Sequence, residues 1–169
     1  YRESMQRLRQ IAGDARIREE CMIMAARIFL ATGDNPGAMR TLNEMIAEFP
    51  DNVDAHRLLS AKHYDFGSPQ LAMKHCQRIT EPAPQDPRTD RLMGLISKDF
   101  DKNELAVTHY TESLKRASGD STFEQTSEVH VELAEVQIRL RNYAAALASL
   151  ANLPAADIPP YLVANARSY

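Results

Sequence analysis

The sequence has little cysteine: Cys21 and Cys76 are the two thiols in 169 residues. They are 55 positions apart and form no CxxC pair, a spacing that does not suggest a disulfide scaffold. We expect both to be free thiols. Free thiols favour a reducing compartment such as the cytoplasm, and they leave the periplasm open because many periplasmic proteins lack disulfides.

Neither sign of charge dominates the chain, and no long hydrophobic run occurs in it. The 20 Lys and Arg residues against 23 Asp and Glu residues give a formal net charge of −3. This balance supplies no general attraction to phosphate backbones or anionic lipids, so nucleic acids and membrane surfaces are disfavoured as partners. No apolar run approaches the roughly 20 residues that span a bilayer. The hydrophobic content of 44% is nevertheless sufficient for a folded core.

Patterns typical of catalysis are also missing. We find no glycine-rich phosphate loop and no Ser-His-Asp or Cys-His arrangement, and we therefore expect no enzyme, cofactor or metal site. The acidic pairs Asp99 with Asp101 and Glu132 with Glu135 are interpreted as solvated helix faces. Five histidines are interpreted as structural, and on a helix the adjacent side chains of His75 and Cys76 point about 100° apart, too far to share an ion. The histidines are His56, His63, His75, His109 and His130.

A repeat with a period of 34 residues runs through the chain. Each copy has a turn residue, then a small residue, then a large residue four positions later and a third core residue three positions beyond that. The turn column is Gly33, Gly67 and Asp101; the small column is Ala38, Ala72 and Ala106; the large column is Leu42, Cys76 and Tyr110; the third is Met45, Ile79 and Ser113. Six extra residues then enter around "ASGDSTFEQ", where Ser121 to Glu124 has the form of a capping box, and the fourth copy continues with Ala146, Leu150 and Leu153.

Each copy predicts two antiparallel helices. The first carries apolar residues at helical spacing, as at Met22, Ala26 and Phe29, and a turn such as "TGDNP" follows it. The second helix carries the small and large columns and ends at Pro50 or Pro84, because proline cannot donate the next helical hydrogen bond.

This pattern resembles the tetratricopeptide repeat, a helix-turn-helix unit of 34 residues. The resemblance implies an all-α, right-handed superhelical solenoid of antiparallel helix pairs. The chain departs from the family in the first helix, where the column that often holds a large aromatic has Met22, His56, Asp90 and His130.

The period also predicts the organisation of the chain. We expect four repeats between two partial ones, so that the sequence is a window from a longer solenoid. The expected segments are 1–18, the second helix of a truncated repeat; 19–52, 53–86, 87–126 with the inserted loop, and 127–158, the four repeats; and 159–169, the start of a further repeat.

The family resemblance implies a non-catalytic scaffold that binds a partner peptide or helix in a concave groove lined by the first helices. The columns that flank the core place arginine and one tyrosine in the middle of this groove, and acidic residues at its C-terminal end. An acidic or mixed peptide is the expected ligand, since arginine pairs with carboxylates and stacks on aromatics; the alternative is that these are ordinary solvated charges. The predicted contact residues are Arg27, Arg57, Tyr64, Arg88, Arg91 and Lys98.

A second hypothesis is that the segment is a structural spacer or a self-assembly module within a larger polypeptide. Apolar faces at the two ends of a solenoid segment are normally covered by neighbouring repeats. Uncovered, they would favour end-to-end association.

Overall fold

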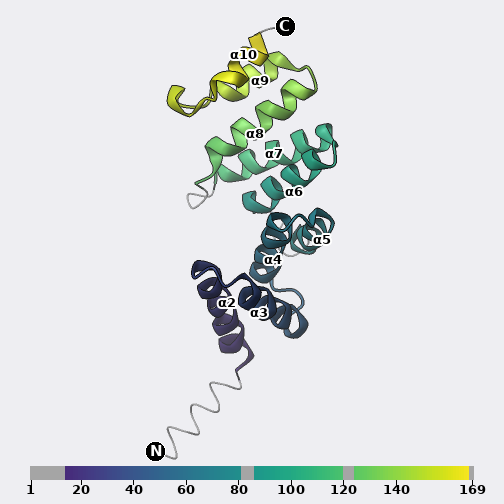
Figure 1. Cartoon of the computed structure of the whole chain (residues 1–169), viewed down its shortest axis with the longest axis vertical. Coiled ribbons are helices and arrows are strands. Elements are labelled where there is room, and N and C mark those ends of the chain that lie inside the picture. The colour runs from purple at the N-terminus through teal and green to yellow at the C-terminus, as the bar shows by residue number, and fades with distance from the viewer. Residues whose placement is uncertain (1–13, 81–85, 120–123, 168–169) are drawn as a thin grey trace, which may run out of the picture. The chain divides into compact units, whose positions relative to one another are not determined.

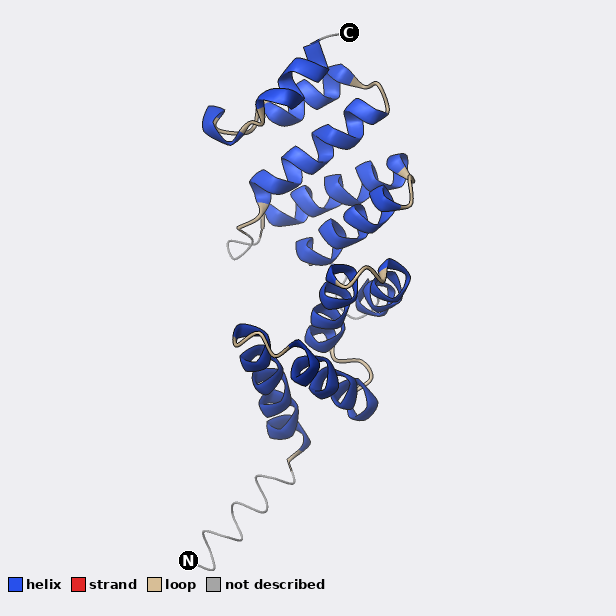
Figure 2. Ribbon diagram, viewed as in Figure 1, coloured by secondary structure: helices blue, strands red, loops and turns tan. Residues whose placement is uncertain are grey.

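The computed structural model describes residues 14–80, 86–119 and 124–167, and this part of the chain contains nine α-helices, one short 3-10 turn and no β-strand (Figure 1, Figure 2). The all-α prediction is therefore confirmed. The chain divides into two compact units, residues 1–82 and residues 83–169, which are treated separately below.

The N-terminal unit contains two helix pairs. In the first pair α2 (Ala15–Ala31) packs on α3 (Asn35–Glu48), and in the second α4 (Val53–Asp65) packs on α5 (Pro69–Thr80). The pairs are joined through contacts between α3 and α4. Helix α2 begins four residues before the expected repeat start at residue 19, because the Asp14 side chain caps it by accepting from the Arg16 backbone N–H at 2.9 Å.

The C-terminal unit has the same serial packing. Helix α6 (Pro87–Asp99) packs on α7 (Asn103–Ala117), α7 on α8 (Thr126–Arg139), and α8 on α9 (Tyr143–Leu150). The 3-10 turn η1 (Ala155–Asp157) then leads into α10 (Pro160–Arg167), which contacts both α8 and α9. The expected capping box and the closing proline at position 84 lie outside the described residues.

All four turns within helix pairs have the same backbone conformation. Gly33, Gly67, Asp101 and Arg141 have positive φ angles of 79°, 70°, 57° and 60°. At each turn the backbone N–H of the following residue donates to a carbonyl five residues back in the chain, as Asp34 does to Phe29 and Asn142 to Gln137, both at 2.8 Å. This is a helix C-terminus closed by a left-handed residue, which glycine adopts without strain. The turn column that the period aligns is thus a conformational requirement.

The three core columns of the second helices are buried as predicted. Every member is at most 9% exposed: Ala38, Leu42, Met45, Ala72, Cys76, Ile79, Ala106, Tyr110, Ser113, Ala146, Leu150 and Leu153. Cys76 is a buried free thiol and Cys21 an exposed one.

The size of the first-helix residue that packs against the large column complements the size of the large-column residue. Ala26 shares a buried cluster with Leu42, and Ala134 shares one with Leu150. Tyr110, the bulkiest large-column residue, faces Gly94, where an added Cβ would lie 2.7 Å from the ring. Size complementarity of this kind is what close packing of a core requires.

Candidate partner-binding faces

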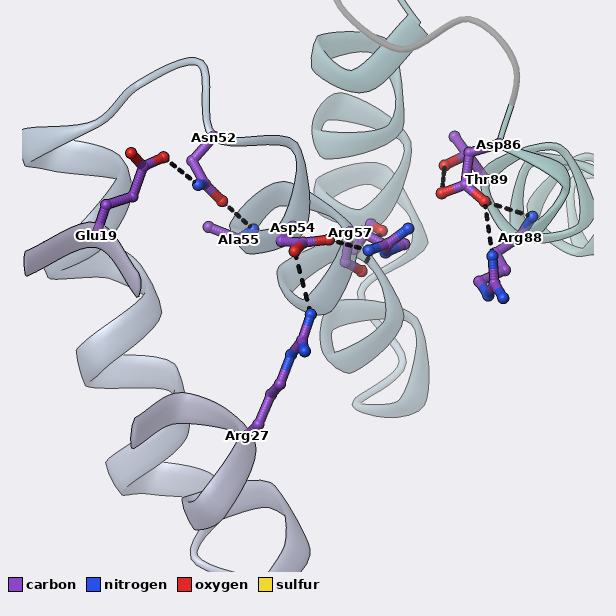
Figure 3. Close-up of polar contacts among 10 residues, drawn as sticks. Glu19, Arg27, Asn52, Asp54, Ala55, Arg57, Asp86, Arg88 and Thr89 are labelled. Atoms are coloured by element: carbon purple, nitrogen blue, oxygen red, sulfur yellow. Dashed lines mark hydrogen bonds and ion pairs between the residues drawn. The ribbon is translucent and has the colours of Figure 1, made fainter. Parts of the chain in front are cut away.

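In the N-terminal unit two arginines on different helices share one carboxylate. Arg27 on α2 donates to Asp54 Oδ2 at 3.1 Å, and Arg57 on α4 donates to Asp54 Oδ1 (Figure 3). We call Arg27, Asp54 and Arg57 the N-terminal face. Two guanidinium groups on one carboxylate leave an excess of one positive charge over these three side chains, and the Arg27 side chain is 51% exposed.

The N-terminal face is held by the start of helix α4. Asn52 caps this helix by accepting from the Ala55 backbone N–H at 2.7 Å, and its side-chain amide donates to Glu19 on α2 (Figure 3). Asp54 therefore lies in the first helical turn, where a negative charge is stabilised by the helix dipole. The cap and the Glu19 contact fix the position of Asp54 relative to α2.

Two other predicted contact residues lie at helix ends. Tyr64 is half-buried near the end of α4. Arg88 lies in the first turn of α6, where Asp86 accepts from its backbone N–H at 3.0 Å and from its guanidinium at 3.5 Å. The capping residue Asp86 thus also orients the Arg88 side chain (Figure 3).

In the C-terminal unit the predicted cation Arg91 forms a two-pronged ion pair between helices. Its Nη2 donates to Glu132 Oε1 at 2.6 Å and its Nε donates to Glu132 Oε2 at 3.1 Å, and the two side chains are only 16% and 14% exposed. Burial by itself would lower the pKa of Arg91, but the hydrogen bonds and charge of Glu132 raise it. This pair joins α6 to α8.

A second ion pair joins the same two helices seven residues further along α6. Lys98 Nζ donates to Glu135 Oε2 at 3.3 Å, and Tyr161 on α10 donates its hydroxyl to Glu135 Oε1 at 3.0 Å. That hydrogen bond raises the pKa of Tyr161. We call Arg91, Lys98, Glu132 and Glu135 the C-terminal face.

The interpretation of Glu132 and Glu135 as solvated helix faces is therefore wrong. Both carboxylates are largely covered and each pairs with a cation on the preceding first helix. The two partners of each ion pair are 41 and 37 residues apart in the sequence, so the pattern of charges along a single helix does not predict the pairs. The repeat period was the signal that could have found them. Tyr161 was missed because it follows the last aligned column.

Next to the C-terminal face is an open, acidic hollow. It is lined by the side of α8 that carries Glu128, Val131 and Glu132, with Glu124, Ser127 and Asp157 around it. The C-terminal face is therefore balanced in charge and borders carboxylates, whereas the N-terminal face has excess positive charge.

Two members of the column that often holds an aromatic in the family, His56 and Asp90, are buried polar side chains with partners in the opposing helix or the adjoining turn. His56 is 6% exposed and contacts the Pro50 carbonyl at 2.8 Å, and Asp90 is 5% exposed and accepts from Arg116 on α7. Burial raises the pKa of Asp90 to about 6, and it outweighs the opposite effect of the Arg116 charge and hydrogen bond. Buried polar groups of this kind are tolerated only when they are paired.

Within the described part of the chain, no group of three His, Cys, Asp or Glu side chains is arranged to hold a metal ion. The helices described there are also too short or too polar to cross a bilayer.

The sequence model of the tetratricopeptide repeat matches residues 29–96. No curated protein matches the sequence.

Several solved structures share the fold. PilF of Pseudomonas aeruginosa superposes with a TM-score of 0.66 at 19% identity, over 79% of this chain and 59% of PilF. MamA residues 41 to the end, from Desulfovibrio magneticus RS-1, gives 0.68 at 16% identity over 88% and 82% of the two chains. A chain of the APC/C hetero-tetramer Cut9–Hcn1 gives 0.68 at 19% identity over 78% of this chain and 26% of that one. At these identities the likeness shows the fold, and the present chain spans less than two thirds of PilF.

Proposed function

Residues 29–96 match the tetratricopeptide-repeat model, and from this premise we propose that the chain is a non-catalytic scaffold that holds a protein or peptide partner on the face of its first helices. A chain with this fold is part of the Cut9–Hcn1 hetero-tetramer. The observation that carries the proposal here is that, within each unit, ion pairs order the polar side chains on neighbouring first helices.

The N-terminal face is the best candidate for an acidic ligand. Arg27 and Arg57 are both oriented by Asp54, and the guanidinium group of Arg27, whose side chain is 51% exposed, could pair with a ligand carboxylate. Arg27 is half-exposed, and an arginine that is already oriented loses little side-chain entropy on binding. Tyr64 on α4 would add a flat surface for the partner.

The C-terminal face has a different role in this proposal. Arg91 and Lys98 are mostly covered and are neutralised by Glu132 and Glu135, so a ligand carboxylate would have to displace a resident one. We propose that these two pairs join α6 to α8 and that the partner meets them as a fixed, neutral surface. Arg88, beside Asp86, would lie at the edge of that surface.

Affinity capture followed by titration calorimetry of the identified peptide tests the proposal. We expect Arg27→Glu to weaken binding of an acidic peptide at least tenfold, because it reverses an exposed charge and leaves the Arg57–Asp54 pair intact. Arg40→Glu is the matched control, since Arg40 is exposed on the second helix α3. Equal affinities for the two variants and the wild type, with unchanged circular dichroism, would refute the assignment of the N-terminal face.

One observation favours self-assembly as a second candidate function. On α2 the side chains of Met24 and Ile28 are each 56% exposed, and Cys21 on the same side is exposed too. The repeat places Cys21 and Ile28 at the positions of Val129 and Val136 on α8, which are fully buried in a cluster with the α7 residues Ala106 and Tyr110. This side of α2 thus has the composition of a surface that packs against another helix. We propose a second copy of the chain as its occupant.

Sedimentation velocity over a hundredfold range of concentration tests self-assembly. A dimer that disappears in the double variant Met24→Gln with Ile28→Gln would support it, and Leu71→Gln, at a 47% exposed leucine on α5, is the matched control. A wild type that stays monomeric at the highest concentration would rule it out and leave the peptide-binding proposal untouched.

A further inference from the structure

Three histidines meet between the helices of the second pair, although their spacing along the chain does not group them. The Nδ1 atoms of His56 on α4 and His75 on α5 lie 2.9 Å apart. The ring of His63, one α4 heptad beyond His56, stacks on His75 with a centroid distance of 5.3 Å and an interplanar angle of 4°. We call His56, His63 and His75 the histidine cluster.

The contacts determine where the protons lie. His56 Nε2 faces the Pro50 carbonyl at 2.8 Å, and a carbonyl can only accept, so His56 Nε2 carries a hydrogen. In neutral His56 the Nδ1 atom is then an acceptor, and the hydrogen between the two Nδ1 atoms belongs to His75. If His56 became protonated while His75 kept that hydrogen, two N–H groups would point at each other across 2.9 Å.

The His56–His75 contact therefore tolerates one added proton and not two. A single extra proton on the pair still leaves one donor facing one acceptor. A second proton removes the acceptor and places two positive charges in contact, with a third imidazole stacked against them. In the unfolded chain each imidazole is free to take up a proton near pH 6.5.

We propose that the histidine cluster is an acid-sensitive contact that holds α4 and α5 together at neutral pH and separates them when it takes up more than one proton. The first-helix residues of α4, Arg57 among them, would then lose their support from α5. Release of a partner in acid would follow, a consequence that rests on the proposed function.

The groups around the histidine cluster are consistent with a contact that weakens as the pH falls. His75 is affected by burial first, then by His56 and His63 on α4 and by Lys74 on its own helix, and together these lower the pKa of His75 to about 4. Burial also lowers the pKa of His63. The Pro50 carbonyl in the α3–α4 turn, which His56 contacts, carries no charge. A histidine that binds its proton less tightly when folded makes the folded state less stable as the pH falls from 6.5 towards 4.

Hydrogen exchange on the full-length chain, corrected for the intrinsic rate at each pH, localises the effect. As the pH falls from 6.5 to 5, we expect the equilibrium constant for opening of α4 and α5 to rise. The rise should be about tenfold per pH unit for each proton that the open state binds in excess of the closed state. In His75→Asn, whose amide can still donate to His56, this dependence should be much weaker. His109→Asn is the matched control, because His109 is on α7 and its pKa is also lowered by burial.

Nitrogen-15 NMR of the wild-type histidine rings supplies a test that does not depend on a variant folding. At pH 7.5 we expect His56 as the Nε2–H tautomer and His75 as the Nδ1–H tautomer. The proposal would be overturned if the rings of His56 and His75 are both cationic at pH 5 while the amides of α4 and α5 remain protected from exchange. It would also be overturned if opening depends on pH equally in the wild type and in His75→Asn. Neither outcome bears on peptide binding at pH 7.5, which tests the proposed function separately.

Discussion

The close approach of Gly94 to Tyr110 leads to a quantitative prediction for the substitution Gly94→Ala. Gly94 lies in the middle of α6, where alanine is ordinarily the better helix former by about 1 kcal/mol. The new Cβ, however, would lie 2.7 Å from Tyr110 Cε1 and 2.8 Å from Cδ1, well inside van der Waals contact. Tyr110 is fully buried, so its ring cannot move into solvent.

Overpacking a core by one methyl group typically costs about 1–3 kcal/mol. Set against the gain of about 1 kcal/mol in helix propensity, Gly94→Ala should lower the free energy of unfolding by about 1 kcal/mol. In a Tyr110→Leu background the clash is removed, since Ala134 already packs with Leu150 at the equivalent positions. There the same substitution should raise stability by about 1 kcal/mol, giving a coupling energy near 2 kcal/mol.

Urea unfolding of all four members of this cycle, followed by circular dichroism, measures the coupling. Gly119→Ala is the control, because its added Cβ would meet its nearest neighbour at an ordinary 3.7 Å. If Gly94→Ala proves equally stabilising in the wild type and in Tyr110→Leu, the size matching between these two columns does not govern the packing of α6 on α7.

The other predictions concern the turns and the buried charges. Arg141→Gly should stabilise the chain by about 0.5–1 kcal/mol because Arg141 has a φ of 60°, whereas Arg139→Gly, at the last residue of α8, should destabilise it; thermal unfolding compares the two. Glu132→Gln should cost about 2 kcal/mol in urea unfolding, since it leaves the buried Arg91 charge without its counterion, while Glu20→Gln at an exposed pair should cost under about 0.5 kcal/mol. The raised pKa of Asp90, about 6, means that the folded state binds this proton more tightly than the unfolded state does. Wild-type stability relative to Asp90→Asn should therefore rise as the pH falls from 7 to 5, and a difference that stays constant over this range would contradict that sign.

Several features of the fold could be predicted because they are local and repeated. The small and large columns recur every 34 residues, and each requires burial for the same reason, namely close contact between neighbouring helices. The turn column was also readable, although Asp101 and Arg141 show that the backbone conformation persists where the glycine does not.

The sequence predicted only some of the residues that form the candidate faces. The period places Arg27, Arg57, Arg91 and Lys98 on first helices, but it does not say which carboxylates face them. Asp54 lies between two arginines, and Glu132 and Glu135 cover Arg91 and Lys98, because side chains from successive first helices approach one another only after the pairs have stacked. The four cations thus have different surroundings, which their positions in the repeat did not distinguish.

The sequence by itself determined the helix pairs, their turns and their buried columns, since each of these follows from spacing along one short stretch of chain and is tested again in every copy. Only the tertiary structure decided which charges neutralise one another and that His75 meets both His56 and His63. These outcomes depend on long-range distances between side chains of different helices, and a change of one or two ångströms there exchanges a solvated charge for a buried pair.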